Sequence, residues 1–170
     1  MNQPSIKKNF IMNALLTISS FIFPLITFPY ISRVLSPEGI GKVSFANSVV
    51  AYFALFAQLG IPTYGVRACA KVRDNKKELS QTVQEIFIIN IVMTIITYIV
   101  FGITLSCVSR LQADKHLLLI ISSTMLFNAA GMDWFYRGLE KYTYITSRSI
   151  LFKFIAIFLM FALVHQKSDY

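Results

Sequence analysis

Residues 86–109 read IFIINIVMTIITYIVFGITLSCVS, an uncharged stretch of 24 residues that decides the fold class. At about 1.5 Å rise per residue, a helix of this length measures roughly 36 Å, which is enough to cross a hydrocarbon layer of about 30 Å. Uncharged stretches of the same length recur at 9–32 and 43–66. The sequence therefore predicts an all-α fold, a polytopic membrane helix bundle.

The composition of the 170-residue chain agrees with a membrane protein. Hydrophobic residues make up 55% and charged residues 14%, with a mean hydropathy of +0.60, whereas soluble domains carry about 25% charged residues. The 16 Lys and Arg exceed the 8 Asp and Glu, which in a soluble protein would suggest a nucleic-acid partner. Here the basic residues lie between apolar stretches and indicate topology instead. We expect no nucleic-acid partner, and the basic segment 67–85 is expected at anionic lipid headgroups.

Five spans are predicted in the chain. They cover about 9–31, 43–65, 86–109, 117–136 and 147–165. Pro24 and Pro29 predict a kink in the first span, because each proline removes a helical hydrogen bond. In the fourth span, Trp134 and Tyr136 are expected to place their polar atoms at the headgroups, as in an interfacial aromatic belt.

Local signals predict where two helices begin. Ser36 is expected to cap a helix that starts at Pro37. Asn75 with Glu78 fits a capping box, so the third span is expected to begin as an amphipathic extension outside the membrane. Gly60 and Pro62 mark a weak point near the far end of the second span.

The distribution of Lys and Arg predicts a cytoplasmic N-terminus. With that orientation the inside segments hold ten basic residues and the outside segments hold five, a bias that follows the positive-inside rule. The inside set is Lys7, Lys8, five residues within 67–85, Arg137, Lys141 and Arg148, and the outside set is Arg33, Lys42, Arg110, Lys115 and Lys167. Cys69 and Cys107 then lie on opposite faces of the bilayer, unpaired.

The sequence contains no pattern typical of an enzyme. It has no glycine-rich phosphate loop, no cluster of metal ligands and no nucleophile beside a histidine, so we expect no catalytic residues, cofactor or metal. Charges within or near the spans remain, and these are costly in a bilayer and therefore candidates for function.

Five residues are candidates for substrate binding. Lys153 lies inside the fifth span, where it is predicted either to bind an anion in a lumen or to extend its stem to the headgroups. Asp133 and Arg137 are four residues apart and can pair on one helix face. Arg33 and Lys42 flank an outer loop, where a solvated role is the alternative.

Three stretches carry a family resemblance. They are PYISRVL at 29–35 with PEGIG at 37–41, GIPTYGVR at 60–67, and DWFYRGLEKY at 133–142. Together they resemble the Wzx-type polysaccharide flippases of the multidrug, oligosaccharidyl-lipid and polysaccharide exporter superfamily. The family pattern has an uncharged polar residue, often Gln, at the position of Arg137.

The resemblance implies a fold of two lobes, each of six spans, around a central cavity. It also implies that undecaprenyl-pyrophosphate-linked oligosaccharide, for O-antigen or capsule assembly, crosses the bacterial inner membrane. Residues 1–170 are then expected to be most of an N-terminal lobe, a truncated chain that needs a missing C-terminal lobe as its partner to translocate substrate.

Two alternatives stay open at this stage. A cation-coupled multidrug exporter of the same fold would need an acidic residue in the middle of the first span, and residues 9–32 contain none. An integral-membrane polymerase or ligase would need a large outer loop, whereas the predicted outer loops 32–42 and 110–116 are short.

Overall fold

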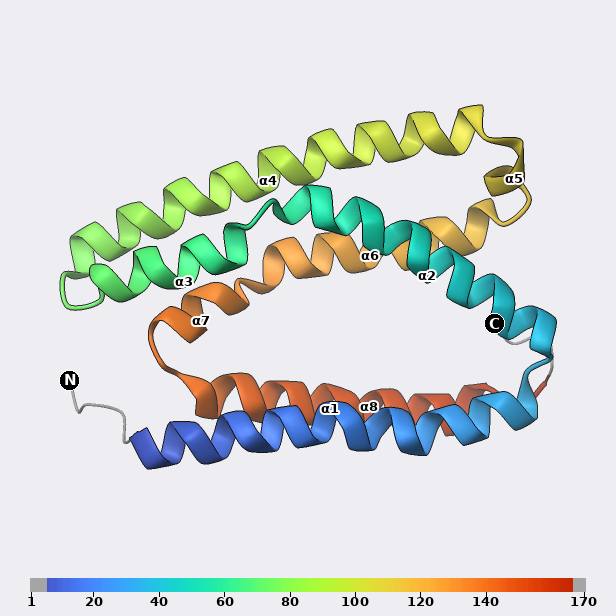
Figure 1. The fold of residues 1–170 in the computed structure, drawn as a ribbon, viewed down its shortest axis with the longest axis horizontal. Coiled ribbons are helices and arrows are strands. Elements are labelled where there is room, and N and C mark those ends of the chain that lie inside the picture. The colour runs from blue at the N-terminus through green and yellow to red at the C-terminus, as the bar shows by residue number, and fades with distance from the viewer. Residues whose placement is uncertain (1–5, 167–170) are drawn as a thin grey trace. The chain divides into compact units, whose positions relative to one another are not determined.

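The computed structural model describes residues 6–166, which fold as helices without a strand in that range (Figure 1). In chain order these helices are α1 (Ile6–Val34), α2 (Pro37–Gln58), α3 (Ile61–Lys71), α4 (Lys76–Cys107), α5 (Ser109–Gln112), α6 (Lys115–Gly131), α7 (Asp133–Gly138) and α8 (Tyr142–Leu163). The predicted all-α class is confirmed. Lys167, one of the basic residues used to predict the topology, lies outside the described residues.

Five helical segments in the described range are long and apolar enough to cross a membrane, which confirms the predicted number. They are Ile6–Val34, Pro37–Lys71, Lys76–Cys107, Lys115–Gly138 and Tyr142–Leu163. All five helical segments begin before the predicted limits 9–31, 43–65, 86–109, 117–136 and 147–165, because backbone hydrogen bonding continues into the preceding polar flanks. The third and fifth segments end two residues earlier than predicted. The connection between α1 and α2, predicted as the outer loop 32–42, is accordingly reduced to Leu35 and Ser36.

Both predicted helix starts are confirmed by their capping hydrogen bonds. The Gly39 amide donates to Ser36 Oγ at 3.2 Å, so α2 begins at Pro37. The amides of Lys77 and Glu78 donate to Asn75 Oδ1 at 3.1 and 3.4 Å, and Asn75 Nδ2 donates to Glu78 Oε1 at 2.7 Å. This reciprocal capping starts α4 ten residues before its uncharged stretch.

Two of the five spans are interrupted by residues with positive φ. The second span breaks at Leu59 (φ 34°) and Gly60 (φ 77°), which is the weak point that the sequence predicted. The fourth span breaks at Met132 (φ 46°), between α6 and α7. The sequence prediction of this span over 117–136 did not include a break, which accompanies the packing of α7 on α3.

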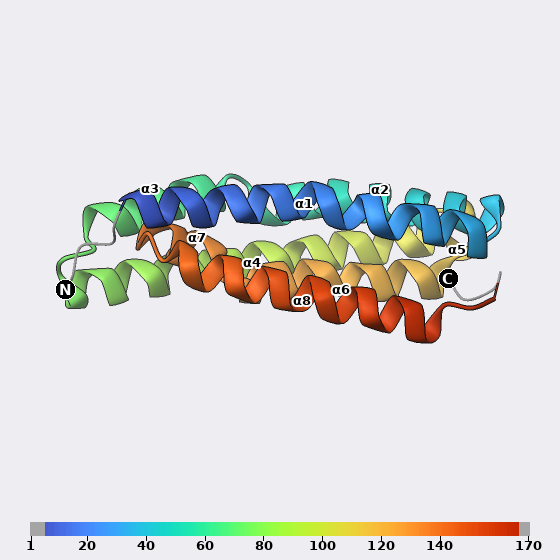
Figure 2. The same cartoon turned by 90° about the horizontal axis from the view of Figure 1, so that it is seen from below.

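The helices group into two compact units, and unit 1 contains α1 and α8. These two helices lie side by side along their length (Figures 1 and 2). Thr146 Oγ1 donates to the Met12 carbonyl at 2.9 Å, and Tyr30 Oη donates to the Val164 carbonyl at 2.8 Å. Ring contacts add to the pairing, with centroids 4.5 Å apart for Tyr30 and Phe161.

Helix α1 is continuous through both of its prolines. Pro24 and Pro29 lie inside the single helix Ile6–Val34. Each proline lacks the N–H that would bond the carbonyl four residues earlier, that of Ser20 or Leu25. The prolines nevertheless do not end the helix.

Unit 2 contains residues 42–139 and is built around α4. Its larger core holds buried side chains from α2, α4, α5 and α6, namely Ala46, Val50, Phe101, Leu105, Leu111, Leu118 and Met125. Phe53 of α2 meets Phe101 of α4 edge to face, with ring centroids 5.1 Å apart. Asn90 Nδ2 of α4 donates to the Ala129 carbonyl of α6 at 3.3 Å, so α4 joins α2 and α6.

The second core of unit 2 joins α3, α7 and the start of α4. Trp134 is 4% exposed and lies against Gly65, and Gly138 lies against Cys69. The indole Nε1 of Trp134 has no hydrogen-bond partner among the described residues. The prediction that Trp134 reaches the headgroups was therefore wrong, since its ring fills the space over a glycine instead.

The two cysteines lie at opposite ends of α4. Cys69 is buried in α3, which packs beside the first part of α4, and the exposed Cys107 is the last residue of α4 (Figure 1). The prediction that these thiols do not form a disulfide agrees with this arrangement. Their positions on the two faces of a bilayer remain a prediction.

Candidate functional site

Lys153, the candidate inside the fifth span, binds hydroxyl groups of α1. Its Nζ donates to Ser19 Oγ at 2.8 Å and to Ser20 Oγ at 3.0 Å. The same atom lies 5.6 Å from the centroid of the Phe23 ring, within the range of a cation–π contact. The lysine head thus rests on one face of α1, and two of its three N–H donors are used there.

The serines that accept from Lys153 are also bonded within their own helix. Ser19 Oγ and Ser20 Oγ both donate to the Leu16 carbonyl, at 2.7 and 2.9 Å. The hydrogen of each hydroxyl is used in that bond, so the oxygen is available to accept a hydrogen bond from Lys153 Nζ. Both hydroxyl groups on α1 therefore act as acceptors toward the Lys153 Nζ.

Arg33, the other candidate in unit 1, is distant from Lys153. It is exposed in the last turn of α1, 13 residues beyond Ser20, which corresponds to about 20 Å along the helix. A cation near the carbonyl end of a helix interacts favourably with the helix dipole. The structure does not bring Arg33 and Lys153 into one binding site.

The three candidate residues in unit 2 lie on two different helices. Lys42 lies near the start of α2, and Asp133 and Arg137 lie in the first and last turns of α7. Asp133 and Arg137 complement the dipole of this short helix. About 24 Å of helix separates Lys42 from the end of α2, and α7 packs on α3 beyond that end. Lys42 therefore does not join the other two.

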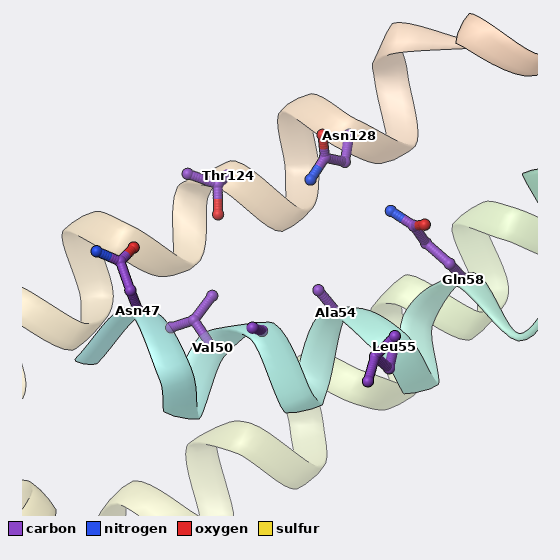
Figure 3. Close-up of a pocket in the computed structure, with 8 residues that line it drawn as sticks. Asn47, Val50, Ala54, Leu55, Gln58, Thr124 and Asn128 are labelled. Atoms are coloured by element: carbon purple, nitrogen blue, oxygen red, sulfur yellow. The ribbon is translucent and has the colours of Figure 1, made fainter. Parts of the chain in front are cut away.

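A polar groove that the sequence analysis missed lies between α2 and α6 (Figure 3). It has a volume of about 250 Å³ and is lined by Asn47, Val50, Ala51, Ala54, Leu55 and Gln58 of α2 with Thr124 and Asn128 of α6. The amide of Gln58 points toward α6, and the amide of Asn128 points toward α2 (Figure 3). Every lining residue is uncharged.

The amides of this groove are unusual for a membrane span. The side-chain amides of Asn47, Gln58 and Asn128 make no hydrogen bond within residues 6–166, whereas Thr124 Oγ1 donates to the Ile121 carbonyl at 2.7 Å. These amides carry no charge, so the high cost of a charge in a bilayer did not mark them as candidates. Their spacing was the available signal, because positions 47, 51, 54 and 58 share one helix face, as do 124 and 128.

The chain matches known proteins along nearly its whole length. A family model described as "Polysaccharide biosynthesis protein" matches residues 6–170. The chain is 30% identical over 170 residues to a "Putative O-antigen transporter" of Escherichia coli (strain K12), a match that covers 99% of this chain and 40% of that protein. A protein of the same name from Shigella dysenteriae is 27% identical over 167 residues, covering 96% of this chain and 41% of the relative. No solved structure matches the chain significantly.

The matches also show how the length of this chain compares with that of its relatives. It spans about two fifths of the length of the curated relatives that it matches. The family match begins at the first residue of α1 and runs through all five candidate spans.

Proposed function

Because the chain belongs to the polysaccharide biosynthesis protein family, we propose that it serves in the translocation of undecaprenyl-pyrophosphate-linked oligosaccharide repeat units across the bacterial inner membrane. The repeat units are used for O-antigen or capsular polysaccharide. In this proposal the N-terminus is cytoplasmic, and the protein is a transporter rather than an enzyme. Residues 1–170 supply most of one lobe, and a second lobe completes the translocation pathway.

A single observation carries the proposal, namely the family match through all five apolar segments. The relatives that match almost the entire chain are named as O-antigen transporters. A cargo with a long lipid tail and a hydrophilic head needs a protein that offers polar groups at membrane depth, because the head cannot cross hydrocarbon unaided. Unit 1 offers Lys153 there, and unit 2 offers the amides of the α2/α6 groove.

Within this proposal the ammonium group of Lys153 binds the pyrophosphate of the cargo. A lysine ammonium is a compact charge that binds phosphate without bidentate geometry. Its contacts with Ser19 and Ser20 hold the head at membrane depth and leave one N–H donor for an anion. Asp133 and Arg137 of α7 form a second charged site in this proposal, in the part of unit 2 where α7 packs on α3.

Complementation tests the proposed function. The complete gene that encodes this chain is expressed in a strain that lacks its O-antigen flippase but makes the lipid-linked repeat unit, and surface polysaccharide is measured by immunoblot. We expect restored surface polysaccharide. Loss of drug sensitivity without restored polysaccharide would instead favour the multidrug exporter. Residues 1–170 expressed alone are expected to leave the strain without surface polysaccharide, since alternating access needs two lobes.

A further inference from the structure

The amides of the α2/α6 groove belong to the second and fourth candidate spans, Pro37–Lys71 and Lys115–Gly138. Asn47 and Gln58 follow Pro37, the first residue of α2, by about 15 and 31 Å of helix. Asn128 follows the start of α6 by about 20 Å. An amide without a hydrogen-bond partner costs several kcal/mol in an apolar medium, so within a span these groups need water or a ligand.

The shape of the groove follows from the residues between the amides. Ala51 and Ala54 line the groove on the same face of α2 as Asn47 and Gln58, and their small side chains leave room in it. Ala54 is labelled in Figure 3 between Asn47 and Gln58. Val50 lines the groove and also belongs, with Ala46, to the core shared with α4. The groove is therefore a fixed feature of unit 2, since α2 is packed on α4 behind it.

The chemistry of the lining selects neutral hydroxyl groups over phosphate. Each amide offers both donors and an acceptor, and the Thr124 oxygen, whose hydrogen is used within α6, can accept. A hydroxyl group also donates and accepts, so it can satisfy either kind of group. Phosphate offers acceptors only and is bound in proteins mainly by cations and backbone amides, and the lining contains no cation.

We propose that the α2/α6 groove binds the sugar part of the cargo through the amides of Asn47, Gln58 and Asn128, with the alanine face of α2 against the apolar face of a sugar ring. This inference rests on the proposed function. It separates two tasks within the chain, because the charged pyrophosphate is met by Lys153 in unit 1 and the neutral glycan by amides in unit 2.

Cysteine labelling in the complete protein tests the inference. In a background with Cys69→Ser and Cys107→Ser, Gln58→Cys and Asn128→Cys are placed in the groove. Phe56→Cys and Phe127→Cys are the matched controls, because these side chains are next to the groove in sequence and are 64% and 73% exposed outside its lining. A small charged methanethiosulfonate is the reagent, since it reacts with thiolates in water.

We expect the groove cysteines to react at least about tenfold faster than the controls, because a thiol in hydrocarbon does not ionise. Prior addition of the lipid-linked oligosaccharide should slow the reaction at the groove, whereas undecaprenyl pyrophosphate without sugar should not. Equal rates at groove and control positions would overturn the inference, because a helix or lipid would then cover the groove. Equal protection by the two lipids would also overturn it.

Export by the parent protein separates this inference from the proposed function. If the parent restores surface polysaccharide but the lipid-linked oligosaccharide does not protect the cysteines of the Gln58→Cys and Asn128→Cys variants, the proposed function stands and the sugar site is wrong. If the parent does not restore it, the proposed function itself fails. As a second measurement, Asn128→Leu is expected to reduce surface polysaccharide several-fold at equal membrane abundance, whereas Phe127→Leu should leave it unchanged.

Discussion

The indole ring of Trp134 occupies the space over Gly65, so that a methyl group built on this glycine would lie 2.6 Å from Cε3 of the ring. This contact joins α7 to α3 beyond the breaks in the second and fourth spans. Gly138 makes a similar approach, since an added methyl group would lie 2.8 Å from Cβ of Cys69. Two glycines thus let two short helices pack closely.

Gly65→Ala should destabilise the protein. Alanine favours a helix over glycine by up to about 1 kcal/mol, but overpacking against Trp134 costs about 1–3 kcal/mol, so the net effect is unfavourable. Thermal unfolding in detergent measures the change. Gly102→Ala in α4 is the control, because an added methyl group there meets no atom within 4 Å, and its melting temperature should be equal to or higher than the parent's. A Gly65→Ala variant as stable as Gly102→Ala would contradict the packing argument.

Substitutions of Lys153 separate its charge from its hydrogen bonds. Lys153→Gln keeps a donor for the hydroxyls of Ser19 and Ser20 but removes the positive charge, and Lys153→Arg keeps both. If the ammonium meets the pyrophosphate, surface polysaccharide should survive the Arg change and fall sharply with Gln, at equal membrane abundance. Equal export from the Gln variant and the parent would indicate that the lysine serves to pack α8 on α1 or to reach the headgroups.

Thiol labelling in sealed cells tests the orientation. Cys107 is exposed at the end of α4, so with a cytoplasmic N-terminus a membrane-impermeant maleimide should label it from outside. Cys69 is fully buried and is a poor reporter from either face. Lys77→Cys, in the exposed first turn of α4, is the better inside probe when Cys107→Ser is also present. Labelling of that cysteine before permeabilisation would reverse the predicted topology.

Asn75→Ala should loosen the first turn of α4. The change removes the two bonds from the amides of Lys77 and Glu78 and the bond to the Glu78 carboxylate, and loss of such a cap costs about 1 kcal/mol. Amide hydrogen exchange over residues 76–80 should become faster, while exchange in the apolar part of α4 stays the same. Asn75→Asp keeps the acceptor and is the control. Unchanged exchange in the Ala variant would show that the cap contributes little to this helix start.

Much of the fold could be predicted from the sequence because its signals are local. An uncharged stretch of 24 residues needs no partner to form a span, and the caps at Ser36 and Asn75 act within three residues of the chain. The break at Gly60 was also visible, because glycine adopts positive φ at little cost. Each of these features depends on neighbours in sequence.

The features that could not be predicted depend on packing between distant residues. Met132 carries no local signal for positive φ, and α7 departs from α6 because its own Trp134 and Gly138 fit on α3. The burial of Trp134 likewise depends on a glycine 69 positions earlier in the chain. For the candidate site, the sequence identified Lys153 as unusual but could not place its ammonium on Ser19 and Ser20.

The bond between Lys153 and Ser19 also bears on the order in which the protein is assembled. Its partners are separated by 134 positions, so at 5–20 residues per second α1 is made on the order of ten seconds before α8. Before α8 is made, the hydroxyl hydrogens of Ser19 and Ser20 are already satisfied, because both donate to the Leu16 carbonyl within α1. Helix α8 carries Lys153, whose ammonium group then donates to the hydroxyl groups of Ser19 and Ser20 on α1. Helix α1, made before α8, therefore presents the hydroxyl acceptors that the Lys153 ammonium requires when α8 packs on it.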